Sequence, residues 1–244
     1  MGRRWRLWLA VVLVLAHGGA VQAEETLAEA RSEFAAADGL LNALYAQAAT
    51  ELPAEAFEDL RRDQRRWLAG RDPYAAAVAR LQGGAAEGAE EDEPWFWLAR
   101  AERTAARSEV LRGWLVYFRD GSDATGWEGV WVDGDGGTVW VAEVAADRVA
   151  LQVFVVRGPT FHLGELAGVA ERHGRTARFT ARFEDEGPPT WLTLVIEGPR
   201  LRVFGEHTWP FRGVRAYFDG DYVRVRTLES GERAELLTLA DAAP

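Results

Sequence analysis

The hydrophobic pattern changes its period near Gly121, and this change constrains the fold more than any other feature of the chain. Before it, apolar residues recur three or four positions apart, as in Leu41, Leu44 and Ala48, which is typical of amphipathic helices. After it, short runs rich in Val, Phe, Trp and Tyr alternate with Gly, Asp and Pro, which is typical of strands. The sequence therefore predicts an α+β protein, with a helical domain over residues 24–119 and an antiparallel β domain over residues 120–244.

The first part of the helical domain is predicted to form a helical hairpin. We expect the break between its two helices near residues 51–54, because Pro53 is tolerated in the first turn of a helix. Gly70 and Pro73 are expected to interrupt the second helix. A short further helical piece is then predicted over residues 74–81.

An acidic segment, residues 82–93, separates this hairpin from a third long helix over residues 95–118. The segment is rich in Gly, Ala and Glu without an apolar period, so we predict a flexible linker with a solvated acidic face. At the start of the third helix, Trp95 and Trp97 flank Phe96 and therefore point to different sides. One of them docks on the β domain, or the two form a candidate partner surface.

The β domain contains eight candidate strands separated by clear turn signals, which predicts an antiparallel barrel or sandwich. The strands are expected at residues 127–132, 138–144, 149–156, 160–170, 176–183, 191–197, 201–204 and 222–227. Arginines alternate with apolar residues in these runs, which predicts a water-facing sheet surface and argues against a membrane barrel. These arginines are Arg178, Arg182, Arg200, Arg202, Arg224 and Arg226.

Residues 1–23 have the three parts of a cleavable signal peptide. Three arginines precede the ten-residue apolar run 7–16, and small residues follow at 21–23. The apolar run is too short to cross a bilayer, which needs about 20 residues. The chain contains no cysteine, so it has neither a lipidation site nor a disulfide. We therefore predict a periplasmic or secreted protein that begins at Glu24, without integral membrane association after cleavage.

The charge of the chain restricts its partners. The full chain has a net charge of −10, and removal of three signal-peptide arginines leaves 25 arginines against 38 acidic residues, or −13. Nucleic acid and anionic membranes are disfavoured as partners, because both require clustered positive charge. A basic protein partner is favoured.

Chemical motifs give little support for an enzyme. The histidines of the mature chain, His162, His173 and His207, lack metal-ligand spacing, and no nucleophile motif such as Gly-x-Ser-x-Gly is present. Asp133-x-Asp135 resembles the start of a calcium loop, but the later ligands are missing. We predict no catalytic, cofactor-binding or metal-binding residue, and leave open a hydrolase with convergent carboxylates or a histidine site.

The helical half contains two motifs, one in each helix of the expected hairpin. The first consists of Asp38, Leu41, Asn42 and Tyr45, and the second of Gln64, Arg65, Trp67, Leu68, Arg71 and Asp72. With these motifs, the chain resembles the LprI family of exported bacterial proteins, which is named for lysozyme inhibition. The β half is similar to a C-terminal domain that accompanies this module in some members. Family members usually have a cysteine shortly after the Arg-Asp pair, where this chain has Pro73-Tyr74-Ala75.

From their spacing, the motif residues are interpreted as mainly structural. Arg65 or Arg71 is expected to pair with Asp38 or Asp72, and Asn42 to bond Gln64 across the hairpin; direct contact with a partner is the alternative. The resemblance implies a non-enzymatic envelope protein that binds and inhibits lysozyme. The alternatives are a structural or assembly module of the envelope and, less well supported, the hydrolase.

Overall fold

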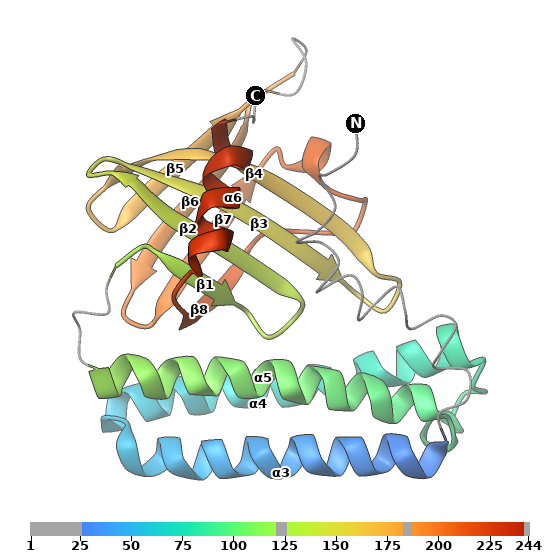
Figure 1. Ribbon diagram of the computed structural model, residues 1–244. Coiled ribbons are helices and arrows are strands. Elements are labelled where there is room, and N and C mark those ends of the chain that lie inside the picture. The colour runs from blue at the N-terminus through green and yellow to red at the C-terminus, as the bar shows by residue number, and fades with distance from the viewer. Residues whose placement is uncertain (1–25, 121–125, 183–186, 242–244) are drawn as a thin grey trace.

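A computed structural model describes residues 26–120, 126–182 and 187–241 of the chain. A layer of long helices lies under a closed antiparallel barrel (Figure 1). The predicted α+β class is confirmed. Of the two β architectures expected, a barrel or a sandwich, the structure has the barrel. The predicted signal peptide lies outside the described residues.

Three long helices form the helical layer: α3 (Leu27–Glu51), α4 (Ala54–Val78) and α5 (Pro94–Asp120). Thr26 and Glu29 form a capping box that starts α3. The break between α3 and α4 falls where it was predicted. Helix α3 packs along α5, and small buried residues such as Ala48 allow the close approach. Helix α5 lies between α3 and the barrel (Figure 1).

The expected interruption of the second helix is wrong, because α4 continues through Gly70 and Pro73 to Val78. Proline cannot donate a backbone hydrogen bond to the carbonyl four residues earlier, which belongs to Ala69. Ala69, Gly70 and Pro73 are all exposed, so water can satisfy that carbonyl. The separate piece expected over residues 74–81 is therefore the end of α4 followed by a π-helix, η2 (Ala79–Gly83).

The acidic segment before α5 contains a short 3₁₀-helix, η3 (Glu90–Asp92). Its Glu91 carbonyl accepts hydrogen bonds from Arg31 and from the indole of Trp97. Trp95 and Trp97 are half-buried and pack against Phe96, Ala79 and their neighbours within the helical half. Neither tryptophan therefore serves as the joint to the barrel.

The barrel closes in sequence order, with every pair of neighbouring strands antiparallel. All eight predicted strands are present, with bounds that differ by a few residues. They are β1 (Gly129–Val132), β2 (Gly137–Ala145), β3 (Arg148–Arg157), β4 (His162–His173), β5 (Thr176–Ala181), β6 (Thr190–Glu197), β7 (Arg200–Glu206) and β8 (Gly220–Arg226). Alternate residues such as Val139, Val141 and Leu151 fill the interior. A short 3₁₀-helix, η5 (Trp209–Phe211), lies in the β7–β8 connection.

The expected water-facing arginines divide into two groups. Arg178, Arg182 and Arg226 are exposed, whereas Arg200 and Arg202 of β7 and Arg224 of β8 are half-buried. The reason is that helix α5 packs against β8. Gly113 allows this contact, because a Cβ atom there would lie 2.6 Å from the carbonyl oxygen of Arg224. The two halves thus share one apolar cluster, in which Trp114 packs near Val223.

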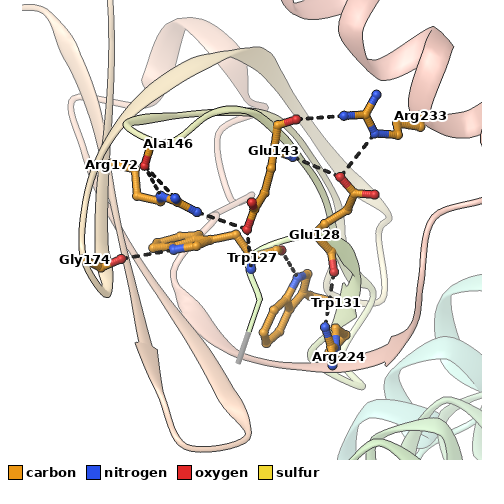
Figure 2. A network of polar contacts seen from close by, with 9 residues as sticks. All are labelled: Trp127, Glu128, Trp131, Glu143, Ala146, Arg172, Gly174, Arg224 and Arg233. Carbon is orange, nitrogen blue, oxygen red and sulfur yellow. Dashed lines mark hydrogen bonds and ion pairs between the residues drawn. The ribbon is translucent and has the colours of Figure 1, made fainter. Parts of the chain in front are cut away.

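A C-terminal helix, α6 (Ser230–Asp241), packs on the outside of the barrel across β2, β3 and β4 (Figure 1). The apolar pattern of residues 230–241 did not predict this helix. Figure 2 shows the polar network at its start: Arg233 donates to the Glu143 carbonyl (2.8 Å) and pairs with Glu128 (3.2 Å). Glu143 in turn pairs with Arg172 of β4 (3.0 Å). This network joins α6 to β2, β4 and the residue that precedes β1.

Candidate functional site

A cavity of about 480 Å³ lies between helices α4 and α5 and the barrel wall, and we call it the cleft. A second hollow of about 490 Å³ adjoins it and shares Arg66, Arg200 and Asp221 with it. We call this second hollow the arginine groove; it is lined by Asp59, Arg62, Arg65, Arg66, Arg200, Arg202 and Asp221. The two are therefore one continuous recess between the helical layer and the barrel.

On the barrel side, the cleft is built around a buried ion pair. Arg157, at the end of β3, lies 2.6 Å from the Asp133 carboxylate, and their side chains are 3% and 7% exposed. Arg157 also donates to the carbonyls of Asp135 and Tyr217 and to the Tyr222 hydroxyl. Burial alone lowers the pKa of Arg157, but the neighbouring Asp133 outweighs it, so the pKa is raised and the guanidinium stays charged.

The turn between β1 and β2 explains the calcium-like Asp133-x-Asp135 pattern. The Asp133 carboxylate accepts hydrogen bonds from the backbone N–H groups of Asp135 and Gly137, each at 2.8 Å. Gly136 has a φ of 89°, which a side chain rarely tolerates. These aspartates therefore serve the turn and the ion pair. Among the described residues, no group of three or more His, Cys, Asp or Glu side chains could hold a metal ion.

On the helical side, Arg107 of α5 is the central residue and is 2% exposed. Its Nε donates to Gln64 (2.7 Å) and its Nη1 to Asp63 (2.8 Å), both on α4. Burial lowers the pKa of Arg107, and the carboxylate of Asp63 opposes this effect. The remaining nitrogen, Nη2, is buried without a hydrogen-bond partner in the described chain.

Two indole N–H groups are also buried donors without a hydrogen-bond partner among the described residues. They belong to Trp67 and Trp114, and both residues line the cleft. A buried donor without an acceptor costs about 1–3 kcal/mol, and more when it is charged. The helical wall of the cleft therefore has an excess of hydrogen-bond donors next to a cavity.

The arginine groove concentrates positive charge on an acidic chain, with five arginines and two aspartates. Arg62 and Arg66 are exposed and pair with aspartates one helical turn away, contacts that contribute little at a surface. Arg200 lies over the ring of Trp114, 4.8 Å from its centroid. Arg65 is exposed and makes no hydrogen bond, ion pair or cation–π contact within the described chain.

The structure places most motif residues between the helices. Arg71 donates to Asp38 (3.3 Å) and Asp72 (2.9 Å), as expected. The expected bond between Asn42 and Gln64 is absent: Asn42 donates to Asp38 at 2.9 Å. The reason is that Gln64 faces Arg107 on α5.

The apolar motif residues divide in a similar way. Leu41 and Trp67 are buried, and the ring of Tyr45 lies 5.4 Å from that of Phe57. Leu68 is 43% exposed and faces away from the helical core. Of the ten motif residues, Gln64 contacts a residue of the cleft wall, Trp67 lines the cleft and Arg65 lines the arginine groove.

Sequence reasoning missed the residues that form the two walls of the cleft, above all Arg107, Arg157 and Tyr222. A signal for the first was present, because Arg107 lies on the same helical face as Thr104, Ser108 and Leu111, all of which are buried. An arginine on the buried face of an amphipathic helix requires polar partners, which indicates a cluster that other elements complete.

Comparison with known proteins gives one match. Residues 18–111 match the family model described as "Lysozyme inhibitor LprI", so the resemblance seen in the helical half is confirmed. The matched segment contains α3, α4 and most of α5 but none of the barrel. No curated protein and no solved structure matches the chain. Within the described residues, none of the helices has the length and apolar character that a bilayer crossing requires.

Proposed function

We propose that this protein is an exported, non-enzymatic envelope protein that binds lysozyme and inhibits it. The observation that carries this proposal is the match of residues 18–111 to the lysozyme inhibitor LprI family model. The described part of this segment, residues 26–111, belongs to the helical layer and includes the contacts Arg71–Asp38 and Arg107–Gln64. The scaffold of the matched module is therefore complete without a disulfide.

The charge of the chain supports a basic partner. With residues 1–23 removed, 38 acidic residues face 25 arginines. An excess of negative charge raises the association rate of a positively charged protein at low ionic strength. The exposed acids Glu91 and Asp92 lie in the matched segment, in the 3₁₀-helix η3 that precedes α5.

The state of the cleft carboxylates favours binding over catalysis. Four of the cleft's five aspartates are ion-paired: Asp63 with Arg107, Asp133 with Arg157, Asp135 with Arg103 and Asp221 with Arg202. The fifth, Asp219, accepts a hydrogen bond from the Gly205 backbone. A glycosidase requires one carboxyl group that is free to donate a proton and a second that is free to act on the sugar or on water. Carboxylates held by guanidinium groups are poorly suited to either role.

An inhibition assay tests the proposal. Purified residues 24–244 are added to lysozyme acting on a bacterial cell suspension, at about 10 mM and about 150 mM salt, between which the Debye length falls from roughly 30 Å to 8 Å. We expect inhibition at micromolar protein that weakens with salt. No inhibition at low salt would overturn the proposal and favour the structural alternative.

A pair of charge-matched variants locates the contact. The double substitution Glu91→Gln/Asp92→Asn removes two exposed acids from the matched helical module. Glu171→Gln/Glu206→Gln removes two exposed acids from the barrel and keeps the same net charge. If the helical module contacts lysozyme, the first variant inhibits less well and with a smaller salt dependence, while the second retains more of the wild-type inhibition.

A further inference from the structure

The arginine groove is not explained by a basic partner. Five arginines in one recess repel a positively charged protein, although the chain as a whole is acidic. Arg65 is a family-motif residue, yet it makes no hydrogen bond, ion pair or cation–π contact among the described residues. Arg62, Arg66, Arg200 and Arg202 each pair with an acidic side chain, whereas Arg65 has no such partner among the described residues. The groove has five arginines and two aspartates, so this unpaired arginine indicates a site for an anionic group.

The cleft continues this site inward. Its volume of about 480 Å³ falls within the range of roughly 300–1,000 Å³ that is common for small-molecule sites. Arg107 Nη2, Trp67 Nε1 and Trp114 Nε1 lie in its wall without acceptors among the described residues. These three nitrogens are themselves covered by protein atoms, so the groups that a ligand can reach in the cleft are the exposed parts of the lining side chains.

The rest of the lining suits a hydroxylated ring. Phe204 and Tyr217 line the cleft and are 47% and 49% exposed, so they offer aromatic surface to a ligand. Carboxylates and guanidinium groups alternate around the same cavity, for example Asp135 next to Arg103 and Asp63 next to Arg107. A hydroxyl group both donates and accepts, so it can bond to either kind of side chain.

The charge balance favours a carboxylate over a phosphate as the anionic group. Asp63, Asp133, Asp135, Asp219 and Asp221 line the cleft and match its five arginines in number. A phosphate close to two negative charges is repelled by these aspartates more strongly than a carboxylate with a single charge. A carboxylate also fits the planar fork of an arginine.

We propose that the cleft and the arginine groove bind a carboxylate-bearing saccharide. The sugar body lies in the cleft between α5 and the barrel, against Phe204 and Tyr217. Its hydroxyl groups bond to the charged side chains that line the cleft, and carboxylates along the chain of sugars contact Arg65 and Arg200 in the groove. This site is independent of lysozyme inhibition, since a small ligand here does not require the exposed acids that a basic protein contacts.

Calorimetric titration of purified residues 24–244 tests the site with three probes: trigalacturonate, neutral maltotriose and triglutamate. We expect trigalacturonate to bind and the other two to bind at least about tenfold more weakly. Arg65→Gln and Arg200→Gln each remove one charge-assisted contact, so each weakens trigalacturonate binding by about 10- to 100-fold. Arg112→Gln is the matched control, because Arg112 is a half-exposed helical arginine that pairs with Glu109 and lines neither recess.

Three outcomes overturn the proposal. Equal binding of maltotriose removes the role of the carboxylate, and equal binding of triglutamate reduces the site to general attraction of anions. Unchanged trigalacturonate affinity in both Arg65→Gln and Arg200→Gln places the ligand elsewhere. Arg65 is exposed and Arg200 lies on the outer face of the barrel strand β7, so the far-ultraviolet circular dichroism of each variant is expected to match that of the wild type. The lysozyme assay is read separately, so failure of one proposal leaves the other standing.

Discussion

Replacing Asp133 by asparagine removes the negative charge that pairs with the buried guanidinium of Arg157 and leaves the shape of the site unchanged. The two side chains are 2.6 Å apart and are 7% and 3% exposed, so water cannot replace the lost charge. Breaking a buried pair by removing one partner costs about 3–5 kcal/mol. Arg157 keeps its hydrogen bonds to two carbonyls and to Tyr222, so we expect a loss of unfolding free energy near the lower end, about 3 kcal/mol.

Urea unfolding followed by tryptophan fluorescence measures this loss, and a melting temperature lower by about 6–12 °C is expected for a chain of this size. Glu109→Gln is the matched control, since it breaks the Arg112–Glu109 pair, whose side chains are 43% and 48% exposed. This control is expected to cost less than about 1 kcal/mol.

A double-mutant cycle with Arg157→Met separates the pair from its parts. Once the guanidinium is gone, Asp133→Asn no longer leaves a charge unpaired, so the double variant should be more stable than the sum of the single losses predicts. The coupling is expected to be about 1–3 kcal/mol. A loss for Asp133→Asn as small as that of the surface control, or strict additivity in the cycle, refutes the reasoning that this wall of the cleft rests on a desolvated ion pair.

Three further predictions concern the fold. Burial raises the pKa of Tyr222 well above its ordinary value, so the stability that its protonated phenol provides is present below pH about 10 and is lost at higher pH. Tyr222→Phe removes the hydrogen bond to the Phe218 carbonyl and should cost about 1 kcal/mol at neutral pH. In urea unfolding, the same variant should show a smaller loss of stability at alkaline pH than the wild type. Gly113→Ala should destabilise by about 1–3 kcal/mol in the same assay, because its Cβ meets the Arg224 carbonyl at 2.6 Å, and a stabilised variant contradicts this. Pro73→Ala should raise the melting temperature, because it restores a helical hydrogen bond to the Ala69 carbonyl and removes a proline penalty of up to about 3 kcal/mol. An unchanged or lower melting temperature would argue that α4 is not strained at Pro73.

Local pattern was sufficient for most elements of this fold. All eight strands were predicted because short β-branched runs between glycine turns have a period that only a strand satisfies. Helix α6 was missed because only two of its apolar residues, Leu236 and Ala240, are buried, so its buried face is narrow. The barrel residues that α6 covers include Ala142 and Ala150, which lie buried on the outer side of the barrel.

The recess could not be predicted in the same way, because its contacts join residues far apart in the chain. Arg107 lies 44 positions from its partner Asp63, and Arg157 lies 65 positions from Tyr222. Spacing along one helix placed Gln64 on a stripe with Trp67 and Arg71, but it could not show that the stripe is shared between two neighbours, α3 and α5. For this reason the predicted partner of Gln64 was wrong, while that of Arg71 was right.

The central claim is that this helical module with its barrel binds lysozyme, and direct titration calorimetry of the two proteins tests it without relying on enzymatic turnover. We predict a complex of defined stoichiometry at about 10 mM salt, with a micromolar or tighter dissociation constant that weakens steadily as salt approaches about 150 mM. Absence of binding heat at several temperatures, together with no co-elution of the two proteins in low-salt gel filtration, would contradict it.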